Sequence, residues 1–536
     1  MRLLPRLTKP ASVGLAALAL AAPLAVRGAQ PAQAGGTLVV GMTAGNVPVT
    51  TGNPDQGFEG YRFVGYNLYD SLVLWDLSTS DKPSDIRAGL ATDWKIDPEN
   101  PKRWIITLRE GVKFHDGCPF TADDVVWNLQ FRTDQKSPGF FAQQFAYTRS
   151  FLTNVKSVTK VDDRTVAFET NFVESLFPFS LSYVMMVSQC RLKSLNGDWS
   201  QYALHPSGTG PYRFDKFVPN QRLELLPNPE YWDSNRIPKQ DRLVLLPMPE
   251  ASTRTAALLS GQVNWIEAPS PDAIPRLKSA GMKVVTNVYP HHWPYMLNLA
   301  RGPFTDLRVR QAANYALNRA DMVELLGGTA MEEHAIVPPT MAYYGKPPKY
   351  DYNPDKARAL LKDAGCLPCK VTFGISTSGS GQMQPLPMNE LVKAQLDAAG
   401  FDVTIQAMDW NALLDVYRAG VDKFPQYDGI NFSRGLLDPV NAIIKPAVKA
   451  YWAPAGSNWG HYSHPDAESL VTRIFGEFDA TKRLALLTDL HELLGRDAAM
   501  IFVVHDLNPR AMSPKVQGFV QAQSWFQDLT PVSVAP

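Results

Sequence analysis

The stretch from Arg87 to Phe131 constrains the fold more than any other part of the chain. Its middle, Trp104 to Leu108, is a run of aromatic and β-branched residues, which is typical of a strand. Two glycine-containing turn signals follow, and a short alternating segment, Val112 to His115, lies between them. Thr121 then stands in an N-cap position before an apolar helical pattern. This order predicts strand, turn, strand, turn and helix in immediate succession.

Helical patterns alternate with strand patterns further along the chain. Residues 353–365 form a helix pattern that ends at a glycine, and residues 389–400 form another, which a strand pattern follows at 401–408. A shorter helix pattern at 253–260 precedes a strand pattern at 262–266. Alternation of this kind predicts an α/β fold, and 536 residues are enough for more than one domain.

The charge balance argues against two classes of partner. Lysine and arginine together number 52, as do aspartate and glutamate, so the formal net charge is zero. A chain without a basic surplus is not expected to bind nucleic acid or an anionic membrane surface. The hydrophobic content of 45% is ample for a large core, so disorder is not expected.

The first 34 residues have the pattern of a secretory signal peptide, with a basic start, an apolar segment at 11–26 and small residues up to Ala34. A membrane anchor is the alternative, but the apolar segment is shorter than the roughly 20 residues that a span requires. No cysteine precedes Cys118, which argues against a lipid anchor. We therefore expect cleavage near Ala34 and a periplasmic protein that is not embedded in the membrane.

The sequence contains four cysteines, Cys118, Cys190, Cys366 and Cys369. The last two form a CxxC motif, for which a disulfide, free thiols and a redox or metal site are all open. We favour a disulfide between Cys366 and Cys369, because a thioredoxin-like site would follow a strand and begin a helix, and no second CxxC is present. The spacing of Cys118 and Cys190 is compatible with both a disulfide and two free thiols.

Common catalytic motifs are missing from the sequence: it has no HExxH, P-loop, nucleophile elbow or EF-hand loop. His291 and His292 are adjacent, so on a strand they would face opposite sides and would not readily share a metal ion. We therefore expect a protein that is not an enzyme and that needs no cofactor or metal.

The stretch from Arg87 to Phe131 closely resembles the signature of the family 5 extracytoplasmic solute-binding proteins, the peptide- and nickel-type binding proteins of ABC importers. Two further segments, 206–214 and 296–322, also match the sequence pattern of this family. The resemblance implies an α/β, two-lobed periplasmic-binding-protein fold with an extra subdomain inserted in the first lobe. The expected order is a signal peptide at 1–34, lobe 1 at 35–78, 206–290 and 506–536, the inserted subdomain at 79–205, and lobe 2 at 291–505.

The resemblance also indicates where the ligand binds. Peptide-binding members carry two cleft tryptophans and, after a small residue, an aspartate that pairs with the α-ammonium of the peptide. Trp410 fits the first tryptophan, whereas Phe432 stands at the second and Gly435, beside Arg434, stands at the aspartate. A buried ammonium needs an ionised partner, so a free-amino peptide lacks its usual anchor here. The candidate contact residues are Trp410, Phe432, Arg434, Gly435 and, from a helix start that lines the cleft in the family, Phe58, Glu59 and Tyr61.

Two interpretations of Arg434 remain open: it could meet a carboxylate or phosphate of the ligand, or lie exposed in a loop. The predicted function is that of the substrate-binding component of an ABC importer, which captures a small polar solute, foremost a short or modified peptide, by closing its lobes. The expected partners are this ligand and the membrane permease subunits, and the protein is expected to be a monomer. The alternatives are a non-peptide solute (opine-like, glutathione-like, a sugar or a metal chelate) and a solute sensor or chaperone on the same fold.

Overall fold

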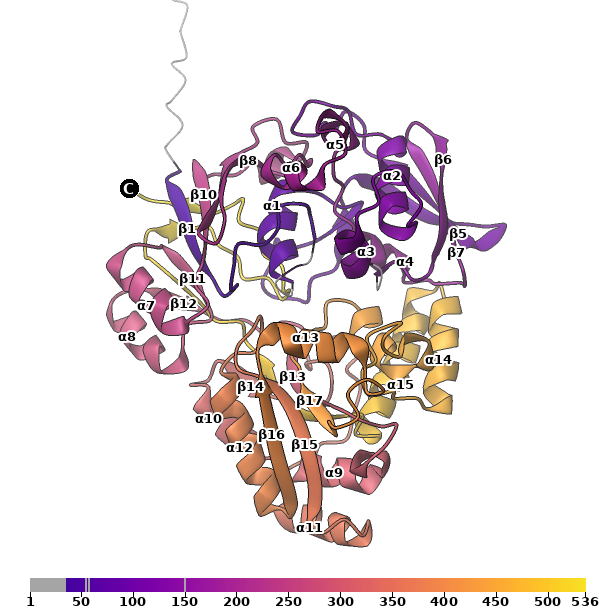
Figure 1. Ribbon diagram of the computed structural model, residues 1–536, viewed down its shortest axis with the longest axis vertical. Helices are drawn as coiled ribbons and strands as arrows, with labels where there is room; N and C mark the ends of the chain where they lie inside the picture. The colour runs from indigo at the N-terminus through magenta and orange to yellow at the C-terminus, as the bar shows by residue number, and fades with distance from the viewer. Residues whose placement is uncertain (1–34, 54, 56–57, 149–150) are drawn as a thin grey trace, which may run out of the picture. The chain divides into compact units, whose positions relative to one another are not determined.

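Two seven-stranded sheets organise the described part of the chain in the computed structural model (Figure 1). The residues that the structure describes are 35–53, 55, 58–148 and 151–536. The predicted signal peptide, residues 1–34, lies outside them.

The first sheet belongs to lobe 1, a name that we use for residues 35–290 and 507–536. Strand β1 lies near its centre and runs parallel to β10 and β11. Leu38 and Val40 alternate into the core, as the period of two in a strand requires. Across the sheet the order is β12 (Lys283–Val285), β20 (Arg510–Met512), β11 (Trp265–Glu267), β1 (Thr37–Met42), β10 (Arg242–Pro247), β9 (Arg222–Pro227) and β8 (Tyr212–Val218).

A separate four-stranded antiparallel sheet lies between β3 (Ile86–Ala88) and β8 in the sequence. Its order is β4 (Ala91–Asp97), β5 (Asn100–Leu108), β7 (Thr165–Thr170) and β6 (Val155–Asp162), and α2 (Ala122–Thr133) packs on β6 and β7. The predicted N-cap is confirmed, because the Asp124 carboxylate accepts a hydrogen bond from Thr121 N at 2.9 Å. The predicted strand at 112–115 is wrong: only Lys113 forms an isolated bridge, because the chain turns tightly back and Phe114 N bonds to Cys118 O.

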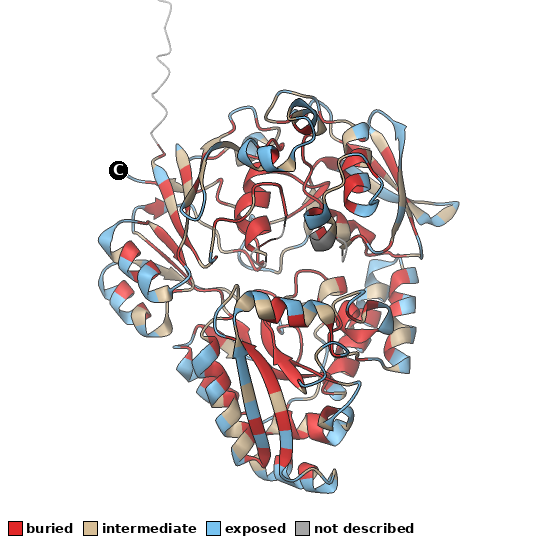
Figure 2. Ribbon diagram, viewed as in Figure 1, coloured by how far each residue is buried: buried red, intermediate tan, exposed pale blue. Residues whose placement is uncertain are grey.

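The second sheet belongs to lobe 2, which we define as residues 291–506. Its strands β13 and β19 are buried along their full length (Figure 2), and α12 (Pro385–Ala398) packs against β15 and β16 (Figure 1). Across the sheet the order is β14 (Ala330–Glu332), β19 (Met500–Asp506), β13 (His291–Leu297), β17 (Gly429–Asn431), β15 (Cys369–Ser376) and β16 (Phe401–Met408), while β18 (Arg434–Gly435) pairs with β13.

The chain passes between the two sheets twice, from β12 to β13 and from β19 to β20. The predicted α/β class is therefore confirmed, with helices and strands in both lobes. Both cysteine pairs form disulfides, Cys118 with Cys190 and Cys366 with Cys369. Within the described residues, none of the helices is both long enough and apolar enough to cross a membrane.

Candidate functional site

The two lobes meet at a hydrogen-bonded group around Asn441. Tyr183 of lobe 1 donates to Asp438 Oδ2 at 2.6 Å, and the Asn441 side chain donates to the same oxygen at 2.6 Å. Asn441 Oδ1 accepts from Lys445 Nζ at 2.8 Å, and Asn441 O accepts from Arg434 Nη2 at 2.7 Å. One asparagine thus links two cations of lobe 2 to the contact with lobe 1.

A second contact between the lobes involves the loop at 377–384. Ser380 Oγ of this loop donates to Glu59 Oε1 in lobe 1 at 2.8 Å. Glu59 is fully buried and also accepts from Arg62 at 2.7 Å, and Arg62 forms a further ion pair with Glu267. Burial raises the pKa of Glu267, while the positive charge of Arg62 opposes that shift. Glu59 therefore belongs to a buried charge network as well as to the contact between the lobes.

Three aromatic rings stack beside the first contact. The Phe432 ring lies 5.3 Å from that of Trp410 and 4.2 Å from that of Tyr417, with interplanar angles of 17° and 12°. A Cβ atom at Gly379 would come within 2.5 Å of the Trp410 ring, so this glycine lets the backbone of loop 377–384 cover it. The stack belongs to a packed apolar cluster in lobe 2.

Trp410 holds its place in this stack through local structure. It is the first residue of α13 (Trp410–Ala419), and Asp409 caps that helix by accepting from Asn411 N and Ala412 N. Its indole Nε1 is buried and has no hydrogen-bond partner among the described residues. The side chain therefore combines a packed ring with an unused donor.

Arg434 is only 7% exposed and lies in β18, two residues after Phe432. Burial lowers its pKa, and the nearby Tyr417 opposes this shift. Burial also lowers the pKa of Lys445 to about 8, while the negative charges of Asp438 and Glu174 oppose that shift. Gly435 lies on the opposite face, in register with His291.

The lobe 1 candidates lie near the first contact. Phe58 is half-buried, and its ring lies 6.0 Å from that of Tyr61 and 6.2 Å from that of Phe151. Tyr61 is buried, and its hydroxyl donates to Tyr183 O at 2.5 Å. Phe151 also stacks on Tyr183 at 4.3 Å. These rings support the hydroxyl that reaches across to lobe 2.

No sequence pattern marked Tyr183, Asn441, Lys445 or Ser380 as part of this region. Their contacts join segments far apart in the chain: Tyr183 and Asp438 are 255 residues apart, and Ser380 and Glu59 are 321 residues apart.

The two adjacent histidines are buried in β13. The His291 ring contacts those of Tyr289 and Trp525, and burial lowers its pKa to about 3. His292 Nδ1 lies 2.9 Å from Glu333 Oε1. Among the described residues, no three histidine, cysteine or carboxylate side chains are grouped so as to hold a metal ion.

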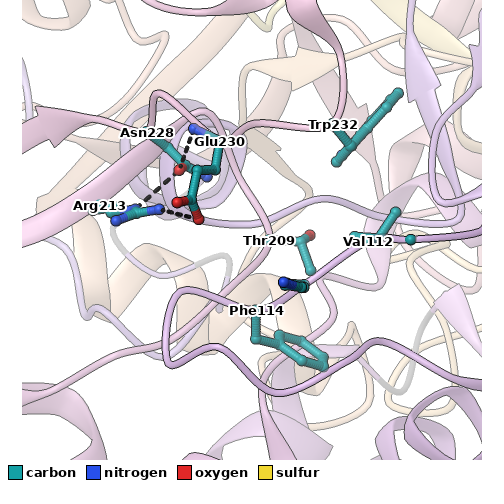
Figure 3. A pocket seen from close by; sticks show the side chains of 9 residues that line it. Val112, Phe114, Thr209, Arg213, Asn228, Glu230 and Trp232 are labelled. Carbon is teal, nitrogen blue, oxygen red and sulfur yellow. Dashed lines mark hydrogen bonds and ion pairs between the residues drawn. The ribbon is translucent and has the colours of Figure 1, made fainter.

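A cavity of about 240 Å³ lies elsewhere in lobe 1 (Figure 3). Its walls include Thr209, Trp232 and Asn228. Of its three charged side chains, Arg213 and Glu230 pair with each other at 3.3 Å, and Lys113 is exposed. None of the residues predicted to contact the ligand lines this cavity. We therefore do not assign the solute to it.

Comparison with known proteins identifies relatives over most of the chain. The model of the bacterial extracellular solute-binding proteins, family 5 Middle, matches residues 85–436. Heme-binding protein A of Haemophilus influenzae is 27% identical over 496 residues, 88% of each chain. The dipeptide-binding protein of Escherichia coli is 25% identical over 84% of this chain and 86% of its own. A periplasmic binding protein of Helicobacter pylori, solved with the peptide STSA, has a TM-score of 0.79 at 24% identity, with 94% of this chain and 99% of that chain covered.

Proposed function

The chain belongs to the bacterial extracellular solute-binding proteins of family 5, and from this premise we propose that it captures a short or modified peptide and delivers it to an ABC importer. Members of this family are binding proteins and not enzymes, so the protein acts outside the cytoplasm as a carrier. The relatives named for dipeptide and peptide binding favour a peptide among the possible solutes.

The observation that carries the proposal is that hydrogen bonds join the two lobes beside an aromatic stack. Tyr183 reaches Asp438 and Ser380 reaches Glu59, so contacts from both lobes converge on one region. A solute held there would touch both lobes and would favour the closed arrangement over the open one by the difference in its affinity for the two. The importer would then recognise the closed form.

Seven residues are proposed to form the site. The rings of Trp410 and Phe432 offer apolar area, Arg434 holds the polar end of the solute, and Gly435 leaves open space on the other face of the strand. The lobe 1 wall would come from Phe58, Glu59 and Tyr61. Of these, Glu59 and Tyr61 are already hydrogen-bonded, so we assign them to closure and Phe58 to direct contact.

We also propose that the signal peptide is cleaved near Ala34 and that the carrier is a monomer. The proposed lobe boundaries are those expected from the sequence, with the inserted subdomain at 79–205, except that β19 extends lobe 2 by one residue to Asp506. Closure of the two lobes needs no second protein chain, because both sides of the site come from one chain.

A thermal-shift screen of the purified protein tests the proposed function. One set of solutes would contain di- to pentapeptides, free and N-blocked, and the other organic acids, opines, sugars and metal chelates. A ligand at 100 times its dissociation constant stabilises the folded state by about 2.7 kcal/mol, which moves the transition by degrees. We expect members of the first set to shift it. A shift by sugars or metal chelates alone would contradict the peptide assignment.

A further inference from the structure

We propose that the solute carries a carboxylate that Arg434 binds, with no ammonium group at that end of the molecule. This inference rests on the proposed function and adds to it the charge of the ligand. The charges are the reverse of those in the peptide-binding pattern, where an aspartate of the protein pairs with an ammonium group of the ligand.

The first argument is the hydrogen bonding of Arg434 itself. Its Nη2 donates to Asn441 O, whereas its Nη1 is buried without a hydrogen-bond partner among the described residues. No carboxylate of the described chain forms an ion pair with this guanidinium. A buried charge is costly unless it is paired, so this cation is set to receive an anion.

Two other buried arginines of the chain, Arg132 and Arg254, have a structural role and use all their guanidinium nitrogens in hydrogen bonds. Arg132 lacks a carboxylate partner too, but its guanidinium donates to Gln144, to Asn128 and to Met185 O, which uses Nε and both Nη atoms. Arg254 likewise uses Nε, Nη1 and Nη2 on four backbone carbonyls. Arg434 differs from both, because it keeps an unused Nη donor beside the contact between the lobes.

The charges around Arg434 favour the same conclusion. Lys445 adds a second buried cation, and the two positive charges disfavour each other. The acids nearest to Lys445 are occupied: Asp438 accepts from Tyr183 and Asn441, and Glu174 accepts from Asn154 at 2.6 Å. Neither of these acids therefore pairs with the guanidinium of Arg434.

The surroundings also fit the shape of a carboxylate. A guanidinium offers paired donors that match the two oxygens of a carboxylate. The buried Nε1 of Trp410 is another unused donor, and its ring lies in the same stack as Phe432, two residues before Arg434. Donors next to an aromatic face suit a small acid with an apolar body, such as an N-acylated amino acid or dipeptide.

Isothermal titration with four matched dipeptides tests the inference. The probes are Ala-Ala, N-acetyl-Ala-Ala, Ala-Ala-amide and N-acetyl-Ala-Ala-amide, which differ only in their terminal charges. The wild-type protein should bind N-acetyl-Ala-Ala at least about tenfold more tightly than its amide. Arg434→Gln should abolish this preference by weakening N-acetyl-Ala-Ala about tenfold, and the neutral probe should change less than about twofold.

Two further variants serve as controls. Arg434→Lys keeps the charge without the paired donors and should retain part of the preference, and it replaces the glutamine variant if that one does not fold. Arg418→Gln removes one exposed positive charge from α13 and should bind all four probes as the wild type does.

The outcomes separate the inference from the proposed function. Equal wild-type affinity for N-acetyl-Ala-Ala and its amide, or an unchanged preference in both Arg434 variants, would overturn the inference and leave peptide binding standing. Binding of none of the four probes, with intact folding by circular dichroism, would overturn the peptide assignment and the inference together.

Discussion

Tyr183 and Asp438 belong to different lobes, and the hydroxyl of the first donates to the Oδ2 atom of the second at 2.6 Å. Both groups are buried, and the Asp438 carboxylate is held in place by hydrogen bonds from Asn441 N at 2.9 Å and from its side chain at 2.6 Å. A contact of this kind can form only when the lobes are together. It therefore couples the closed arrangement to the polar group that surrounds Arg434.

Removing this hydroxyl should weaken ligand binding more than it weakens the fold. A net hydrogen bond is worth about 1 kcal/mol, so Tyr183→Phe should raise the dissociation constant about fivefold when measured by calorimetry. Tyr212→Phe is the matched control, because that hydroxyl bonds to Gln240 inside lobe 1. The control should change thermal stability without changing affinity. If both variants bind the solute equally well, the contact across the lobes has no part in closure.

Trp410→Ala should weaken binding while the protein stays folded. The substitution removes one ring of the stack with Phe432, and a stacked aromatic contact contributes about 0.5–1.5 kcal/mol beyond its buried area. We therefore expect the dissociation constant to rise about three- to tenfold. Trp94→Ala, at a half-buried tryptophan in β4, should leave the affinity unchanged. Equal affinity in the wild type and the Trp410 variant would reject its role as a wall of the site.

Glu174 should lower the stability of the protein as the pH rises through the range in which this residue is protonated in the folded state and ionised in the unfolded state. Burial raises the pKa of Glu174 from 4.5 to about 7, although the hydrogen bond from Asn154 opposes this shift. Between these values the folded state keeps a proton that the unfolded state has lost, so each step up in pH favours unfolding. The full effect at pH 7 is at most about 3 kcal/mol.

Glu174→Gln should remove this dependence, because glutamine keeps an acceptor for Asn154 and does not titrate. Urea unfolding from pH 4.5 to pH 7 should show the variant gaining stability relative to the wild type by roughly 2–3 kcal/mol. Glu169→Gln, at a carboxylate that is 39% exposed, is the control and should follow the wild-type profile. Parallel curves for wild type and Glu174→Gln would contradict the prediction.

The two disulfides should differ in their contribution to stability. The Cys118–Cys190 bond joins residues 72 apart, whereas Cys366 and Cys369 are 3 apart. Loop entropy in the unfolded chain predicts a loss of about 4 kcal/mol without the first bond and about 2 kcal/mol without the second. The urea midpoint of a Cys118→Ser, Cys190→Ser double variant should therefore fall further than that of Cys366→Ser, Cys369→Ser. The reverse order would show that the loop model does not describe this chain.

Local patterns predicted the elements of this fold better than they predicted the site. The capping pair of Thr121 and Asp124 is three residues apart, and the strand at Trp104–Leu108 carries its own composition, so both could be read from the sequence. The pairing of Cys118 with Cys190 could not, because it depends on how distant segments fold together. The same holds for Asn441, whose four hydrogen-bond partners include a tyrosine 258 residues away.

Arg434 illustrates the limit of pattern reading at the site. Its position next to the missing aspartate was visible, but its exposure was not, and both an exposed loop and a ligand contact were open. The structure places it 7% exposed, with one Nη atom on Asn441 and the other unused. Only the three-dimensional surroundings of a charge decide whether it is already paired.

A substitution at Gly435 tests the charge of the ligand from the opposite direction, by adding an acid to the site. A Cβ atom added there would meet only Leu437 Cγ within 4 Å, at 3.7 Å, which is an ordinary van der Waals contact. Gly435→Asp would restore the acid that the peptide-binding pattern carries, on the face in register with His291. The new carboxylate could pair with an ammonium group, which a charge-assisted hydrogen bond stabilises by about 1.5–3 kcal/mol.

We therefore expect Gly435→Asp to bind Ala-Ala and Ala-Ala-amide at least about tenfold more tightly than the wild type does. Its affinity for N-acetyl-Ala-Ala should fall, because the added negative charge lies on the residue next to Arg434. Gly435→Asn is the matched control, since it has nearly the same size and no charge, and it should gain nothing for either amine. If the asparagine variant gains as much as the aspartate variant, shape and not charge governs this position. If neither variant gains affinity for the amines, the ligand's end group does not lie beside residue 435.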